Sequence, residues 1–209
     1  MAILGILLTL AFGAFRMSSR IFQDTTTRQS AEIQLRTIKI LAERDIELSN
    51  FWNIKHYPRT TTDGERDAVV FNSLSDWVPP GNFDPATGRP AWDRYVLWYA
   101  TQQNPGRLIR QLIAPPLNSG TFLDSPYPAP SASNFSDGNP DSNEDAIYTR
   151  VLSEDVLDFQ VNPKLQNGSL EFRIRLRSLG LQRQGSSDRT EENLEVNVTF
   201  VPRNTWPAI

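Results

Sequence analysis

Apolar residues dominate the first fifteen positions of the chain. These positions read MAILGILLTLAFGAF, contain no charged residue, and are followed at once by Arg16 and Arg20. As a helix rising about 1.5 Å per residue, they would cover roughly 22 Å, which is less than the ~30 Å hydrocarbon core of a bilayer. We therefore interpret residues 1–15 as a membrane-type segment that is shorter than a full span.

A second pattern follows, with helical spacing of apolar residues and no proline or glycine between residues 16 and 57. Pro58 and the polar residues 59–66 mark its end. The sequence therefore predicts one helix over residues 1–57, apolar in its first half and amphipathic in its second. The apolar positions of the second half are Ile21, Ile33, Ile38, Leu41, Ile46, Leu48 and Phe51, and charged residues on the other faces are Arg36, Lys39, Glu43, Arg44 and Glu47.

The remainder of the chain alternates apolar and polar residues, as half-buried β-strands do. Residues 170–177 and 194–200 are the clearest cases, and we expect these two strands to pair. Residues 95–101 are apolar on both faces and predict a central strand, joined by the turn Asn104-Pro105-Gly106 to a strand over residues 108–114. Further strands are expected at residues 68–71, 147–152 and 156–161.

These patterns predict an α+β fold in which a long N-terminal helix packs on an antiparallel sheet. The domains would be an anchor and spine helix over residues 1–57 and a β-rich head over residues 58–209. Residues 115–145 are rich in Pro, Ser, Asn and Asp and predict a flexible loop within the head. The proline-rich and aromatic connection over residues 76–90 is expected to fold back and cover an edge of the core, with a partner-binding surface as the alternative.

Composition narrows the classes of function. The formal net charge is −3, and 22% of the residues are charged, so no basic excess indicates a nucleic-acid partner. The chain has no cysteine and one histidine, which excludes disulfides, thiolate metal sites and Cys-His catalysis.

The N-terminal region resembles a known family. The run Ala2-Ile3-Leu4-Gly5-Ile6-Leu7, the further apolar residues and the long amphipathic continuation are similar to the N-terminal helix of type IV pilins and type II secretion pseudopilins. In that family a basic leader is cleaved before a methylated aromatic residue, and a buried glutamate follows within a few residues. This chain begins after both, so we expect the leader and about nine mature residues to be missing, as the resemblance implies.

The resemblance extends, less specifically, to the order of elements in the head. That order is similar to the J-type pseudopilin and the W-type minor pilin. It implies a structural minor subunit of a type IV pilus or type II secretion filament, acting in filament initiation or at the tip. The expected partners are other pilin or pseudopilin subunits and the inner membrane, with the head periplasmic or extracellular.

An acidic segment could bind calcium. Asp137, Asn139, Asp141, Asn143 and Asp145 place oxygen ligands at every second position, like the first half of a calcium loop. Ser142 stands where a glycine is expected, and Tyr148 stands where the bidentate acid belongs. A plain acidic loop is therefore our expectation, with weak calcium binding as the alternative, and we predict no cofactor.

Catalytic signatures are missing from the sequence. It contains no GxSxG, HExxH, Walker A or GxGxxG motif. The acidic pairs, Glu154 with Asp155 and Asp63 with Glu65 and Asp67, are interpreted as solvated, and His56 as a cation at the end of the helix. We predict that the protein is not an enzyme. The alternatives are a single-pass anchored domain that binds a carbohydrate or receptor through Trp77, Trp92 or Trp98, and a hydrolase with two acidic residues.

Overall fold

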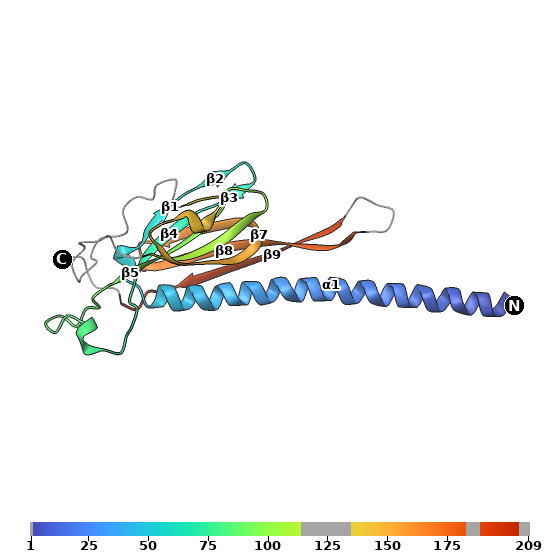
Figure 1. Cartoon of the computed structure of the whole chain (residues 1–209), viewed down its shortest axis with the longest axis horizontal. Helices are drawn as coiled ribbons and strands as arrows, with labels where there is room; N and C mark the ends of the chain where they lie inside the picture. The colour runs from blue at the N-terminus through green and yellow to red at the C-terminus, as the bar shows by residue number, and fades with distance from the viewer. Residues whose placement is uncertain (1, 114–134, 183–188, 205–209) are drawn as a thin grey trace.

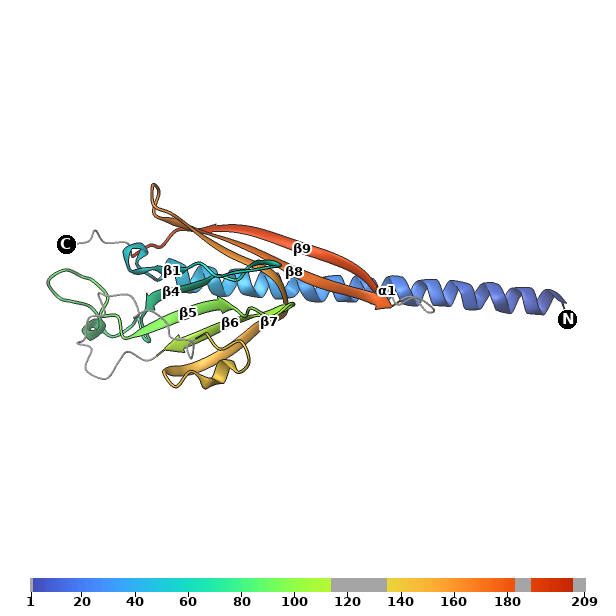
Figure 2. The ribbon, with the colours of Figure 1, turned by 90° about the horizontal axis from the view of Figure 1, so that it is seen from above.

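The computed structural model describes residues 2–113, 135–182 and 189–204, which form a long helix beside a β-rich head (Figure 1). Helix α1 (Ala2–Glu47) lies along one face of the head and extends well beyond it at its N-terminal end (Figures 1 and 2). The head contains the strands β1 (Lys55–Tyr57), β2 (Thr60–Thr61), β3 (Gly64–Glu65), β4 (Ala68–Ser73), β5 (Arg94–Ala100), β6 (Gly106–Ile113), β7 (Ala146–Lys164), β8 (Ser169–Gln182) and β9 (Arg189–Phe200). Three short 3-10 helices are η1 (Phe51–Asn53), η2 (Pro80–Asn82) and η3 (Pro140–Ser142).

Seven strands form one antiparallel sheet in the order β1-β4-β5-β6-β7-β8-β9, and β2 and β3 form a separate hairpin. The expected pairing of residues 170–177 with residues 194–200 is confirmed, with Leu170 opposite Phe200 and Leu176 opposite Leu194. The hairpin around Asn104-Pro105-Gly106 is confirmed as β5 paired with β6. Long pairings between neighbours in sequence thus follow directly from alternation and turn residues.

The inner core lies between α1 and one face of the sheet, mainly over β8 and β9. Ala31, Leu35, Ile38, Ala42 and Ile46 form the buried stripe of the helix. Their steps of three or four residues keep all five on one helical face. On the sheet side, alternate residues such as Phe172, Ile174 and Leu176 face the helix.

A second core covers the opposite face of β4, β5 and β6. Tyr95, Leu97 and Tyr99 point into it, so β5 is buried on both faces, as its unbroken apolar sequence predicts. Trp77 and Phe83, from the connection between β4 and β5, pack against this cluster. The prediction that residues 76–90 cover a core edge is therefore confirmed.

The fold class predicted from the sequence is wrong as stated and needs correction. α1 ends at Glu47 rather than at Tyr57, and residues 55–57 form the border strand β1, paired with β4. Most of the described head is one curled antiparallel sheet (Figure 2). In the part of the chain that the structure describes, no helix combines the length and the apolar character needed to cross a membrane. The pilin-like fold predicted from the sequence is not supported as stated.

Local contacts explain why the helix stops early. The Ser49 hydroxyl donates to the carbonyl of Ile46 at 2.6 Å, and the side chain of Asn50 accepts from the backbone N–H of Trp52 and so caps η1. Lys55 and Tyr57 then pair with Val70 and Ala68 in β4. Residues 55–57 therefore form a strand paired with β4, although the lack of proline and glycine in this segment had favoured a helix.

Strand β7 also differs from expectation. Two strands were predicted, over residues 147–152 and 156–161, whereas one strand runs from Ala146 to Lys164. Its first half pairs with β6 and its second half with β8, and the exchange occurs at Val156. One long strand thus joins β6 and β8 within a single sheet. The predicted flexible loop over residues 115–145 lies mostly outside the described residues.

Candidate functional site

An apolar stripe runs along the face of α1 that points away from the sheet. Leu8, Phe15, Phe22, Ile33 and Ile40 form this stripe, which we call the outer stripe, and their side chains are 55% to 72% exposed. Their steps of seven, seven, eleven and seven residues each complete nearly a whole number of turns at 3.6 residues per turn. The stripe therefore stays on one side of the helix, opposite the stripe that packs on the sheet.

The N-terminal part of α1 is apolar on further faces as well. Its other exposed apolar side chains are Ile3, Ile6, Leu10, Phe12, Met17 and Ile21. Buried positions of α1 in the described residues begin only at Ala31, and Figure 1 shows the N-terminal part projecting past the strands. A monomer in water rarely exposes so much contiguous apolar surface without a binding role.

A buried ion pair fixes the C-terminal part of α1 to the sheet. The Arg110 guanidinium, on β6, contacts both carboxylate oxygens of Asp45 and approaches Oδ1 to 2.9 Å. The indole of Trp98, on β5, donates to Oδ2 at 3.3 Å. All three side chains are buried. Residues of two strands therefore bind one residue of the helix. These contacts fix the rotation of α1 about its own axis and so determine that the outer stripe points away from the sheet.

A second buried carboxylate joins the segment after the helix to the head. Asp67 accepts from the backbone N–H of Arg59 at 3.1 Å and of Val161 at 2.8 Å, and its Oδ2 lies 2.9 Å from Nε2 of His56. The prediction that His56 sits at the helix C-terminus is therefore wrong, because His56 lies in β1. The prediction that Asp67 is solvated is also wrong, since it is buried and fully engaged.

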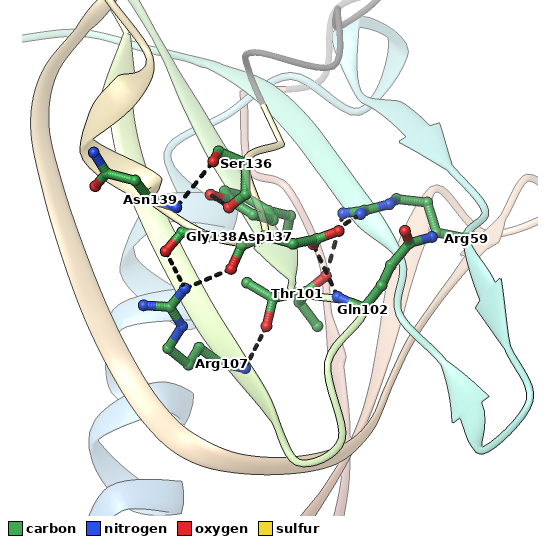
Figure 3. A network of polar contacts seen from close by, with 10 residues as sticks. Arg59, Thr101, Gln102, Arg107, Ser136, Asp137, Gly138 and Asn139 are labelled. Atoms are coloured by element: carbon green, nitrogen blue, oxygen red, sulfur yellow. Dashed lines mark hydrogen bonds and ion pairs between the residues drawn. The ribbon is translucent and has the colours of Figure 1, made fainter.

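The proposed calcium segment is folded onto the head by its own hydrogen bonds (Figure 3). Oδ1 of Asp137 accepts from the backbone N–H of Gln102 at 2.9 Å and from Arg59 at 3.3 Å. Arg107 donates to the carbonyls of Asp137 and Gly138 at 2.6 and 3.0 Å. The structure thus uses Asp137 to anchor the chain rather than to face outward.

The other residues of that segment have structural contacts too. The side-chain oxygens of Asn139 and Asn143 each accept from the backbone N–H two residues later, of Asp141 and Asp145. No three acidic or histidine side chains gather as a metal site within residues 2–113, 135–182 and 189–204. The described part of the loop therefore holds no ready-made cluster of three acidic ligands.

The residues named for the two alternative functions, carbohydrate binding and acid–base hydrolysis, do not gather in one site among the described residues. Trp98 and Trp92 are buried, and Trp77 packs edge-on against Trp92, so these rings do not form an exposed carbohydrate platform. Asp155 lies 3.4 Å from Arg177, and Glu65 accepts from the Thr60 hydroxyl at 2.8 Å. Nothing in this arrangement assigns one carboxylate as an acid and another as a base.

Tyr99 links the segment around Asp137 to the second core, because its hydroxyl donates to the carbonyl of Ser136. Its ionisation makes the stability of the fold depend on pH in a way that can be tested. Burial raises the pKa of its phenol to about 12, and the nearby Asp137 adds to the rise. Because the folded pKa exceeds the unfolded value of 10, the stabilising effect is complete below pH 10 and disappears as the pH rises through 12. We expect alkaline titration, followed by tyrosinate absorbance, to show one tyrosine ionising near the upper value. Tyr99→Phe should remove that phase, and its persistence would contradict the assignment.

No family model, no curated protein and no solved structure matches the chain. The resemblance to pilins and pseudopilins therefore remains a prediction from the N-terminal residues.

Two features of the site were not predicted from the sequence. Asp45 stood among several charged residues of an amphipathic helix, and its role depends on Arg110, 65 positions later. The predicted apolar pattern also mixed two faces of the helix, because it included Ile33, which is exposed, and left out Ala31 and Ala42, which are buried. Small residues permit close approach of helix and sheet, and that signal is visible in the sequence once alanine is counted as apolar.

Proposed function

We propose that the protein is a structural subunit of a type IV pilus or type II secretion filament that works through protein–protein contacts. The observation that carries the proposal is the outer stripe of α1, which continues from the projecting N-terminal part to Ile40 beside the head. Other pilin or pseudopilin subunits are the proposed partners, with their helices packed against this stripe. We further propose that the subunit acts in filament initiation or at the tip. Its helix would be anchored in the inner membrane, and its head would be periplasmic or extracellular.

The shape of the apolar surface supports helix partners in addition to lipid. Near the head, the stripe is narrow, and charged residues lie along one flank of it, namely Glu32, Arg36 and Glu43. A narrow apolar seam bordered by charges suits a second helix, whereas lipid favours a surface that is apolar all round. Ile33 and Ile40 lie beside the head, where a simple membrane anchor would not require them.

The N-terminal part suits a bundle or membrane interior. Residues 3–22 carry apolar side chains on several faces. These side chains can be removed from water first by lipid and, after assembly, by packing against the helices of other subunits. In this proposal the contacts between subunits are made by helices in an apolar core, so the head does not have to carry a catalytic pocket. The proposal therefore assigns assembly to α1 and leaves the head as the surface presented outside the helical core.

The test is to identify what contacts the full chain in cells. A tagged full-length chain would be expressed in its source organism, treated with a chemical cross-linker, purified in detergent and analysed by mass spectrometry. We expect cross-links to other subunits with pilin-type N-terminal helices. Cross-links confined to a receptor or a carbohydrate-bearing protein, with no pilin-type subunit, would overturn the proposal and support the anchored binding domain.

A further inference from the structure

The turn between β7 and β8 holds the one Asn-Gly pair of the chain, Asn167-Gly168. It spans residues 165–168 and joins Lys164 to Ser169, which face each other at the ends of the two strands. Asn167 is exposed, and Figure 2 shows the turn projecting from the sheet. Because glycine has no Cβ to shield its backbone nitrogen, an exposed asparagine before glycine is open to attack by that nitrogen.

The local backbone leaves the nitrogen of Gly168 accessible. Within the described residues, the N–H of Asn167 bonds to the carbonyl of Lys164 at 3.3 Å, whereas no acceptor is bonded to the N–H of Gly168. Gly168 has a φ of +61°, and a Cβ at this position would have no atom within 4 Å. The nitrogen of Gly168 is therefore neither held by a hydrogen bond within the fold nor crowded by neighbouring side chains.

A buried hydroxyl polarises the carbonyl that this nitrogen would attack. Ser169 is 1% exposed, and its hydroxyl donates to Oδ1 of Asn167 at 2.7 Å. Attack on Cγ of Asn167 places negative charge on Oδ1, so the Ser169 hydroxyl stands where that charge develops. A donor already fixed at such a position lowers the barrier of the step.

We propose that Asn167 is a site of spontaneous deamidation. The deprotonated nitrogen of Gly168 forms a bond to Cγ of Asn167, the Cγ–Nδ2 bond breaks, and Nδ2 leaves as ammonia with a proton from solvent. Water then opens the five-membered succinimide at either carbonyl and leaves an aspartate or an isoaspartate at position 167. Water is the only co-reactant, and no atom is oxidised or reduced. The product carries one negative charge more than the original chain.

The two products affect the turn differently. An aspartate keeps an acceptor oxygen for the Ser169 hydroxyl, so the turn retains its hydrogen bond. An isoaspartate routes the backbone through the side chain and so lengthens the connection between Lys164 and Ser169, which face each other at the hairpin end. This chemistry lies far from the outer stripe in function, and the inference does not depend on the proposed filament role.

The test follows two asparagines of the folded chain during incubation at mildly alkaline pH, because the attacking nitrogen must lose its proton. The full-length chain in detergent would be digested after increasing times, and deamidation and isoaspartate at positions 167 and 197 measured by mass spectrometry. Asn197 is the internal control, since it is equally exposed but precedes the β-branched Val198 within β9. We expect Asn167 to convert at least about tenfold faster than Asn197. Equal rates at the two positions, or conversion of Asn167 only after unfolding in urea, would overturn the proposal.

Variants of the turn separate the role of the hydroxyl from that of the Asn-Gly pair. Ser169→Ala should slow conversion about tenfold in the folded chain, as expected for loss of one hydrogen bond to the reacting oxygen. Ser169→Thr keeps the hydroxyl and should keep the rate, and in urea all three chains should convert alike because no donor is fixed there. Asn167→Gln keeps an amide but would need a six-membered ring, so conversion at this position should be lost. An unchanged rate in folded Ser169→Ala, with the fold checked by circular dichroism, would contradict the assigned role of Ser169.

Discussion

Replacing Asp45 by alanine is expected to lower the free energy of unfolding by about 3–5 kcal/mol, the usual range when one partner of a buried ion pair is removed. The substitution leaves the Arg110 guanidinium buried without its carboxylate and deprives the Trp98 indole of its acceptor. Few other single changes in the described structure would strand a buried charge in this way. The loss would fall at the junction of α1, β5 and β6.

Urea unfolding followed by tryptophan fluorescence measures this effect directly. Arg44→Ala is the matched control, since Arg44 also contacts Asp45 but its side chain is 58% exposed, and the expected loss is below about 1 kcal/mol. Replacing both partners, as Asp45→Leu with Arg110→Met, removes the stranded charge and should recover most of the stability. A loss from Asp45→Ala no larger than that from Arg44→Ala would show that the pair does not fix the helix.

Charges placed on the outer stripe are expected to abolish assembly while the fold survives. Ile33→Glu with Ile40→Glu would force two carboxylates into the proposed helix contact, where burying charge without a partner costs several kcal/mol. A cost of that size corresponds to a weakening of at least ~100-fold. Both side chains are exposed in the isolated subunit, so its free energy of unfolding should change by no more than about 0.5 kcal/mol for each substitution.

Lys39→Glu provides the matched control for this prediction. It changes the net charge by the same two units as the double variant, but Lys39 lies on the flank of the helix, away from the stripe. Recovery of cross-linked subunits with each tagged variant, from cells, would be the measurement, with circular dichroism and urea unfolding to check the fold. Unimpaired assembly of the Ile33→Glu, Ile40→Glu variant would contradict a helix contact at the stripe.

The sequence predicted those parts of the fold that depend on neighbouring segments. Alternation over residues 170–177 and 194–200 set the β8–β9 register, and Asn104-Pro105-Gly106 marked the β5–β6 hairpin. In each case the information lies within one or two adjacent segments. The two-sided burial of β5 followed for the same reason, because an unbroken apolar strand needs cover on both faces.

The features that were not predicted from the sequence depend on contacts between residues far apart in the chain. The end of α1 at Glu47 depends on residues 55–57 pairing with β4, and the unbroken course of β7 depends on successive pairing with β6 and β8. Asp45 and Arg110 meet only once the sheet has formed, and neither residue carries a local signal for the pair. The outer stripe required knowing which helical face the sheet covers, because Ile33 had been assigned to the same apolar pattern as buried Ile38.

The most direct test of the central claim, that the outer stripe of α1 contacts other subunits, is site-specific photo-cross-linking in cells. A photoreactive phenylalanine analogue would replace Phe22, Ile33 or Ile40 in the stripe, and Arg36, Lys39 or Glu43 on the flanks, in the full-length chain. The proposed function predicts cross-links to pilin-type subunits from the three stripe positions and little or none from the three flank positions. Cross-links of equal yield from both sets, or from the flanks alone, would contradict the claim that this face of the helix builds the filament.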